Sequence, residues 1–471
     1  MGKYTYIGGD YLENIGGNKI VYVKGNNETH SNGQIIQTAE KGIRFGEPKD
    51  PPVIEGIKEI VNCVVHFRRC SDYMDLNKAE RKGEVEPDTS KIYGFDWMRD
   101  EYEDNYGYFW DSKNRDVDGK SINIKSPSSN YTNLEKEYDP YKIVWNKQNY
   151  YTPWLSIYET QKARLRVTMD WDKKPSVLEW DKAFSHPELL KLPDASSIEI
   201  KKGKGMFSSY QDIIIECIAP ITEEKEIRLL ADGELAGKLK IVPNKKRTLK
   251  ISWCLVDITS KNKKGQRKDI EVLKDKLSKQ KLDRFVKHLG LSQALINVDA
   301  TETYTELYMN DLGYDWKKYT QFLGYKYDGS GVINIGTLET DCQLEYEKKY
   351  PKDENHIILF LINNYFPTPE VNRPNKIITE VPGSKAVGKA FELGSKYLSL
   401  FQGLEEHTKT VVHEILHDLT LHHSFDKDAK HKFKSYSTEN FMDYCNEAND
   451  TRGSLWKWQW EQLWNYLDTK K

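Results

Sequence analysis

The sequence predicts a multidomain fold in which β-rich, sandwich-like modules come before an α/β domain with a mixed sheet. Short runs of β-forming residues, separated by turn-forming residues, fill the chain up to about residue 246. From residue 247 a strand-like run is followed by apolar residues at helical spacing and then by further strands. With 471 residues, the chain has room for about three domains.

Charge and cysteine content argue against several classes of protein. The 70 Lys and Arg nearly balance the 72 Asp and Glu, so nothing in the overall charge indicates a nucleic-acid partner. The 6 cysteines are scattered, which predicts neither a disulfide scaffold nor a Cys-x-x-Cys zinc site. The longest apolar run is 357–362, whereas a membrane span needs about 20 residues. The first residues lack a signal-peptide pattern, so we expect synthesis in the cytoplasm and no membrane span.

The region before residue 247 divides into three parts. Residues 1–52 are rich in Gly and Asn and end in a Pro-rich linker, and they are too poor in apolar residues to bury a core alone. Residues 53–159 form a β-rich module with a strand-like run at 59–68. Residues 160–246 alternate strands and turns, beginning with 164–170, which predicts a sandwich-like module.

The α/β domain is expected over 247–471. A strand over 247–258 precedes a helix whose apolar positions run from 270 to 289. Further strands are expected at 294–298, 356–362 and 397–401. We expect this half of the chain to fold alone.

A C-terminal helix carries a stripe of aromatic and apolar residues after Ser454, which is its expected N-cap. Such a stripe could grip a ligand, but core packing is the more common role, and we expect it here. The stripe consists of Trp456, Trp460, Leu463, Trp464 and Leu467.

The strongest chemical signal is a cluster of histidines between residues 407 and 423. His413 and His417 are four residues apart on a predicted helix, so both imidazoles lie on one face, as two zinc ligands require. Glu414 follows the first histidine and can accept a proton from an attacking water. His423, at the tenth position after His413, supplies a third ligand. The pattern HExxH arises by chance in about 2% of chains of this length, and the third histidine lowers that to roughly 0.05%.

This pattern resembles that of the metzincin clan of zinc metallopeptidases, HExxHxxGxxH followed by a Met-containing turn. The segment 437–444 is similar to the Met-turn. The resemblance covers about 247–471 and implies a metzincin-like fold and one zinc ion per chain. It implies that Met442 supports the zinc site from below without binding the metal. It also implies that Tyr444 reaches the zinc side of the site, whereas a tyrosine packed under the floor is the structural alternative.

One residue departs from the family pattern. The glycine that lets the chain turn after the helix is Thr420 here. A β-branched residue with positive φ is costly, so we expect this turn to be built differently, which leaves His422 open as an alternative third ligand. A downstream glutamate such as Glu439 is a further alternative, although it leaves His423 and Met442 unexplained.

The N-terminal Gly/Asn pattern, with Gly8-Gly9-Asp10 and the segments 14–25 and 31–37, resembles the leaders of proteins associated with type VI secretion in bacteria. That resemblance implies an effector delivered by the secretion apparatus, whereas a flexible tail is the ordinary interpretation.

The sequence therefore favours a zinc metalloendopeptidase that hydrolyses a protein or peptide, with His413, His417 and His423 as ligands and Glu414 as general base. Two alternatives stay open. One is a binding or adhesion protein with a structural or inactive zinc site. The other is a different zinc hydrolase, such as one acting on a peptidoglycan peptide or a small amide. An edge strand beside the zinc would indicate an extended peptide substrate, and a closed pocket a small molecule.

Overall fold

The computed structural model describes residues 63–70, 72–75, 79–80, 84–98, 133–142, 149–199, 210–258, 268–280, 286–300, 304–314, 336–350, 356–363, 366–372, 377–386, 388–390, 393–400, 408–433, 436, 438–444 and 452–470. The chain divides into two units, Met1–Ile60 and Val61–Lys471, and the described residues lie in the second. The N-terminal segment expected over 1–52, with its resemblance to type VI leaders, lies outside them.

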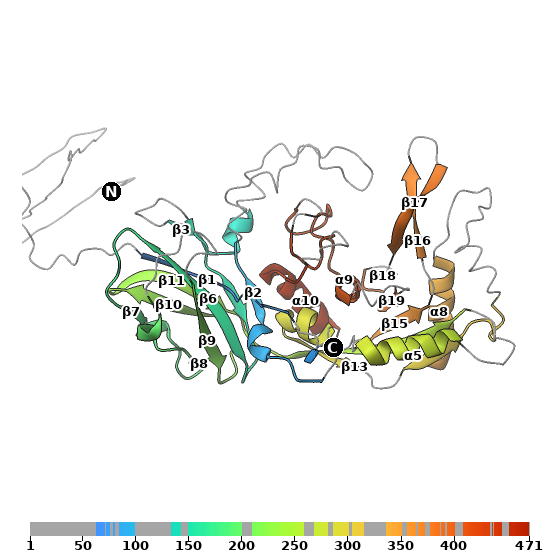
Figure 1. Ribbon diagram of the computed structural model, residues 1–471, viewed down its shortest axis with the longest axis horizontal. Helices are drawn as coiled ribbons and strands as arrows, with labels where there is room; N and C mark the ends of the chain where they lie inside the picture. The colour runs from blue at the N-terminus through green and yellow to red at the C-terminus, as the bar shows by residue number, and fades with distance from the viewer. Residues whose placement is uncertain are drawn as a thin grey trace, which may run out of the picture. The chain divides into compact units, whose positions relative to one another are not determined.

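Two β-sheets share one apolar core in the first half of this unit (Figure 1). The first sheet has the order β1 (Cys63–Arg69), β6 (Lys162–Trp171), β9 (Gln211–Cys217) and β8 (Leu190–Lys191). The second has the order β2 (Gly94–Asp96), β5 (Trp154–Ser156), β11 (Glu234–Ile241), β10 (Lys225–Ala231) and β7 (Leu178–Trp180). A short ribbon of β3 (Tyr141–Lys142) and β4 (Asn149–Tyr150) and three 3-10 turns, η1 (Thr89–Lys91), η2 (Lys182–Phe184) and η3 (Ala195–Ser197), complete this half. In β6 the alternate residues Ala163, Leu165 and Val167 are buried in the shared core.

Strands from the two expected β-modules are mixed within these sheets. β1 pairs with β6, and β2 pairs with β5, which in turn pairs with β11. The boundary expected between residues 159 and 160 therefore separates strands of one sandwich rather than two modules. Alternation of apolar residues indicates that a strand exists, but its partner is chosen by packing between distant segments.

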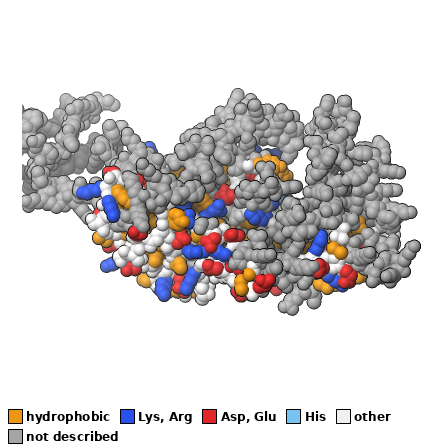
Figure 2. Space-filling view, viewed as in Figure 1, with side chains coloured by type: hydrophobic (Ala, Val, Ile, Leu, Met, Phe, Trp, Pro, Cys, Tyr) orange, Lys and Arg blue, Asp and Glu red, His pale blue; other side chains and the backbone are white. Residues whose placement is uncertain are grey.

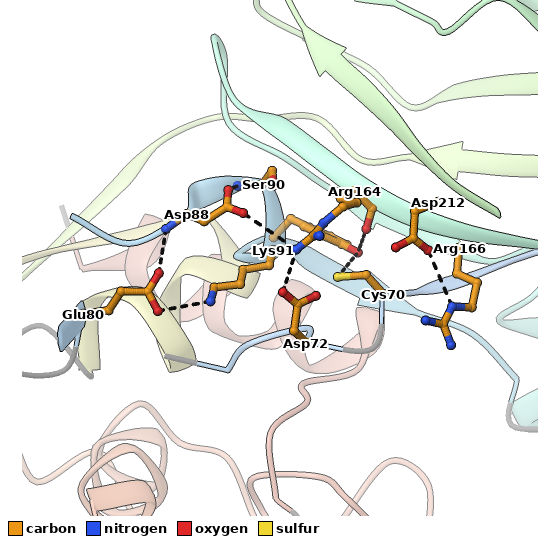
Figure 3. Close-up of polar contacts among 10 residues, drawn as sticks. Cys70, Asp72, Glu80, Asp88, Ser90, Lys91, Arg164, Arg166 and Asp212 are labelled. Atoms are coloured by element: carbon orange, nitrogen blue, oxygen red, sulfur yellow. Dashed lines mark hydrogen bonds and ion pairs between the residues drawn. The ribbon is translucent and has the colours of Figure 1, made fainter. Parts of the chain in front are cut away.

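Ion pairs on the outer face of β6 attach the segment after β1 to the sheet (Figure 3). Arg164 donates to Asp72 at 2.7 Å and lies 3.7 Å from Asp88, which caps η1. The buried pair Lys91–Glu80 joins η1 to the preceding segment at 3.1 Å. Figure 2 shows acidic and basic side chains interspersed over the described surface on this side of the molecule.

The second half contains a mixed sheet of the order β13 (Ile296–Ala300), β12 (Arg247–Asp257), β15 (His356–Ile362), β19 (Tyr397–Leu400) and β18 (Gly388–Ala390), with β14 (Thr305–Tyr308) also paired with β12. β18 runs antiparallel to β19, and the other pairs are parallel. β16 (Phe366–Asn372) and β17 (Ile377–Ala386) form a separate hairpin. The expected mixed sheet is therefore confirmed.

Four helices are described in this half: α5 (Lys268–Gln280), α8 (Gly336–Lys349), α9 (Thr408–Asp418) and α10 (Lys457–Thr469). The helix expected between 270 and 289 corresponds to α5 and to a π-helical turn, η4 (Val286–Gly290), which continues into the 3-10 turn η5 (Leu291–Ala294). No helix among the described residues is long and apolar enough to cross a membrane.

The aromatic stripe of the C-terminal helix packs into the core, as expected. Trp460 and Leu463 are fully buried, and Trp464 is partly buried against the same core. The N-cap expected at Ser454 is wrong, because α10 begins at Lys457 after Trp456. The reason is that Gln459 closes this helix end by accepting a hydrogen bond from the Trp456 amide at 2.9 Å.

Strand β2 joins the sandwich to the second half of the chain. A Cβ at Gly94 would lie 2.2 Å from the Gln293 carbonyl oxygen, so only glycine allows this close approach. Asp96, at the end of β2, accepts hydrogen bonds from the Lys457 amide at 2.8 Å and from the Tyr138 hydroxyl at 3.0 Å. One apolar cluster includes residues of both halves. The expectation that 247–471 folds alone stays a prediction, and the shared cluster indicates that such a fragment would expose apolar residues that the sandwich covers.

We predict that Asp96→Ala lowers the free energy of unfolding by about 1–2 kcal/mol, because the first amide of α10 loses its cap across the two halves. Urea denaturation of the full chain measures this change. Asp194→Ala is a matched control, because Asp194 caps only the short surface turn η3. Equal effects of the two substitutions would contradict a joining role for Asp96.

Candidate metal centre

Helix α9 carries the first two histidines because its apolar face is packed into the core. Val411, Val412, Ile415 and Leu416 are fully buried. A Cβ at Gly290 would lie 2.4 Å from Val412 Cγ1, so this glycine lets η4 approach the helix closely. With one face fixed, His413 and His417 project from the same side, one turn apart.

Three imidazoles converge at one point. His417 Nε2 lies 3.1 Å from His413 Nε2 and 3.1 Å from His423 Nε2. The ligating atoms of all three lie within 4.8 Å of one another, and among the described residues they form a group that could hold a metal ion. Two nitrogens bound to a tetrahedral zinc at 2.0–2.1 Å would be about 3.3 Å apart, so the spacing fits that ion.

The opposite ring nitrogen of each histidine is engaged by an acceptor. His413 Nδ1 donates to the Phe441 carbonyl at 2.7 Å, and His417 Nδ1 donates to the Leu421 carbonyl at 2.8 Å. His423 Nδ1 lies 3.1 Å from the Asp426 carboxylate. A carbonyl can only accept, so the Nδ1 atoms of His413 and His417 carry the protons, and the Nε2 lone pairs of these two rings face one another.

Burial keeps the rings of His413 and His417 neutral. Desolvation, with the neighbouring rings of His417 and His423, lowers the pKa of His413 well below its usual value. Desolvation and the nearby His423 lower the pKa of His417 to about 4. Two neutral imidazoles, those of His413 and His417, whose Nε2 lone pairs converge repel one another, and a cation at the centre of the three rings would relieve that repulsion.

The alternative ligands lie outside this cluster. His422 is partly buried but does not belong to the group formed by His413, His417 and His423. Glu439 accepts a hydrogen bond from the Ser454 hydroxyl at 3.3 Å instead.

The turn after α9 differs from the expectation. Thr420 has φ +73, so it adopts the left-handed conformation of the family glycine, and the expected different turn is wrong. Thr420 N donates to the His417 carbonyl at 2.8 Å, and Leu421 N donates to the Leu416 carbonyl at 2.9 Å, which is a Schellman motif. The left-handed conformation costs about 1–2 kcal/mol. Gln462 of α10 offsets part of that cost by donating to the Thr420 carbonyl at 3.0 Å.

Met442 lies in a turn that is bonded to both sides of the site. Met442 is fully buried. Its carbonyl accepts a hydrogen bond at 2.8 Å from the amide of Ser424, the residue that directly follows His423. The carbonyl of the preceding residue, Phe441, accepts the hydrogen bond from His413 Nδ1. The turn therefore fixes the orientation of one ring and the position of the chain that carries another.

Glu414 lies between the helix and the edge of the mixed sheet. It is buried, and its Oε2 accepts a hydrogen bond from the Ala390 amide at 2.7 Å. Ala390 ends β18, the last strand in the sheet order. The carboxylate beside the histidines is thus held by the backbone of an edge strand.

Tyr444 stands beside the histidines rather than beneath them. Its ring centroid lies 4.9 Å from that of His423 and 6.4 Å from that of His413. The side chain is 41% exposed, whereas a tyrosine packed under the floor of the site would be buried. Burial of the hydroxyl, with the nearby Asp426 carboxylate, raises the pKa of Tyr444 to about 12, so the hydroxyl stays protonated at neutral pH.

Sequence reasoning missed several residues that orient the site. Asp426 could have been suspected, because an acidic residue three positions after a ligating histidine can reach its ring. Ala390 and the carbonyl of Phe441 act through the backbone, so their residue types carry no signal. Asp443 accepts from the amides of Tyr436, Thr438 and Tyr444, each at 2.8 Å, and so fixes the loop beside the site.

Comparison of the chain with protein-family models and with curated proteins finds no match.

We predict that His423→Ala loses bound zinc, whereas His422→Ala retains it, because only His423 belongs to the converging group. Elemental analysis of the purified full-length variants measures the metal content. The two substitutions remove adjacent histidines and serve as controls for each other. Zinc loss in His422→Ala instead would show that the ligand set is shifted by one residue.

Proposed function

We propose that this protein is a zinc-dependent metalloendopeptidase. The observation that carries the proposal is the convergence of three histidine Nε2 atoms, with every Nδ1 atom engaged elsewhere. The motif resembles that of metzincins, and a mixed sheet with a histidine-bearing helix is compatible with a metzincin-like domain over 247–471. The other steps of the proposed reaction are assigned to residues of the chain that surround the metal site.

The donor set suits zinc in a catalytic rather than a structural site. Neutral imidazole nitrogens are good zinc ligands, and structural sites have four protein ligands, whereas catalytic sites have three and keep one position open. The group formed by the described residues contains three. A bound zinc ion would supply Lewis acidity, which polarises a carbonyl and makes water more acidic near neutral pH.

Glu414 is proposed as the general base. Its carboxylate accepts a proton from the attacking water and passes it to the leaving amine. A carboxylate has several lone-pair positions, so the hydrogen bond from Ala390 can persist while the proton moves. An intact general base next to the first ligand argues against the alternative of a binding protein with an inactive site.

The edge strand supports a peptide substrate over a small amide. β18 ends the sheet order, and its last amide contacts Glu414. A peptide in extended conformation can add to such an edge through its main chain, which would bring its carbonyl groups past the carboxylate. We therefore favour a protein or peptide substrate.

Met442 and Tyr444 are assigned supporting roles. Met442 is proposed as the apolar floor of the site, since it is fully buried in the turn that carries the Phe441 carbonyl. Tyr444 is proposed to donate a hydrogen bond from its hydroxyl to the oxygen that becomes negative during attack on the carbonyl. Delivery as an effector by a type VI-like apparatus stays a prediction from residues outside the described part of the chain.

We predict that Glu414→Ala retains zinc but loses about 10²–10⁴-fold in peptide hydrolysis, because the carboxylate moves protons and does not bind the metal. Cleavage of a peptide library, measured beside zinc stoichiometry, tests both parts. Full activity of the zinc-loaded variant would refute the proposed mechanism.

We predict that Tyr444→Phe lowers kcat while KM and zinc content change little, because the ring is kept and only the hydroxyl is removed. An oxyanion donor contributes about 3–4 kcal/mol in the transition state, so kcat should fall about 10²–10³-fold. Steady-state kinetics measures it. An unchanged kcat, or a change confined to the thermal unfolding midpoint, would make Tyr444 a scaffold residue.

A further inference from the structure

Aromatic rings form a continuous row from the converging histidines to the surface. Phe425 stacks on His423 with centroids 4.8 Å apart, and Tyr444 meets Phe425 at 4.7 Å. Tyr436 lies 5.6 Å from Tyr444. We call Phe425, Tyr436 and Tyr444 the aromatic platform.

The platform is exposed, unlike the aromatic residues of the core. Tyr436 is 59% exposed and Tyr444 is 41% exposed, whereas Trp456 and Trp460 are buried. Single exposed aromatic residues are common, but two exposed tyrosines that contact one another leave a larger apolar surface available to a ligand.

One residue of the platform has an unfavourable backbone conformation. Tyr436 has φ +62, a conformation that is unfavourable for a residue with a bulky side chain. The buried carboxylate of Asp443 accepts from the amides of Tyr436 and Tyr444, and so fixes both tyrosines to one anchor. Strained residues that the surrounding structure over-determines tend to occur at functional sites.

We propose that the aromatic platform binds an apolar side chain of the substrate, preferably aromatic, next to the bond that is cut. The inference rests on the proposed peptidase function. Its basis is the unbroken series of ring contacts that leads from His423 through the platform to the exposed ring of Tyr436. A peptide lying along β18 past Glu414 would carry side chains beside the same histidines, and one of them would meet these rings. Tyr436 is then a specificity-determining residue.

The expected effect follows from ring-on-ring contact. An aromatic pair contributes about 0.5–1.5 kcal/mol beyond burial, which corresponds to about 2- to 13-fold. Removal of the Tyr436 ring should therefore reduce the preference for Phe over Ala by that factor. Cleavage of the Ala peptide should hardly change, since it makes no such contact.

The experiment measures kcat/KM of the zinc-loaded full chain on matched peptides that carry Phe or Ala at each position flanking the cut. Tyr436→Ala should lower the Phe-to-Ala ratio about 2- to 13-fold, and Tyr436→Phe should keep it. Tyr304→Ala is the control, because Tyr304 is similarly exposed at 40% but lies outside the site. Binding of the same peptides, with a fluorescent label, to the Glu414→Ala variant gives a readout that does not need hydrolysis.

The outcomes separate this inference from the function on which it rests. An unchanged Phe-to-Ala ratio in Tyr436→Ala overturns the inference while leaving the peptidase intact. Equal losses for the Phe and Ala peptides also overturn it, since they indicate a structural role. If no peptide is cut but the Glu414→Ala variant prefers Phe only when Tyr436 is present, the platform is a binding site and the peptidase proposal fails.

Discussion

The orientation of the three histidine rings is the constraint on which the site depends. The Nδ1 atom of each ring forms a hydrogen bond with an acceptor on a different segment: the turn after α9, the loop that follows His423, and the turn that contains Met442. These segments are therefore positioned by the histidines as much as the histidines are positioned by them. A shift of any one acceptor would rotate a ring and separate the Nε2 atoms, which explains why two of the acceptors are backbone carbonyls of tightly bonded turns.

The same constraint accounts for the strain at Thr420. The Leu421 carbonyl must point at His417, and only a left-handed residue directly before it lets the chain reverse within one turn of the helix. The neighbouring loop packs closely against Thr420 in this conformation. A Cβ at Gly394 would lie 3.3 Å from the Thr420 methyl group, so glycine leaves room for that methyl. Gln462 binds the Thr420 carbonyl from α10. Because α10 is capped by Asp96 of the sandwich, the first half of the chain contributes to the same turn.

Local patterns in the sequence predicted much of this arrangement. The apolar face of α9, the buried strand β15 and the His413–His417 spacing each depend on neighbours within a few residues, and such patterns are legible in one sequence. The partner of β1 and the sharing of one core between the two halves depend on contacts between distant segments. The expectation for Thr420 is wrong for a related reason. The steric cost within one residue argues against positive φ, whereas the hydrogen bond from α10 and the packing against Gly394 stabilise that conformation.

The hydrogen bond from the Ala390 amide to Glu414 links the last strand of the mixed sheet to the carboxylate that is proposed as the general base. Under the proposed function, a peptide would pair with the outward side of β18, whose last amide donates to the carboxylate of Glu414. Movement of β18 during substrate pairing would therefore move the carboxylate as well. In the proposed peptidase, the same three-residue strand would set the position of the main chain of a bound peptide and the position of Glu414. Such coupling holds the reacting groups in one geometry, which is where much of the catalytic advantage of an enzyme arises.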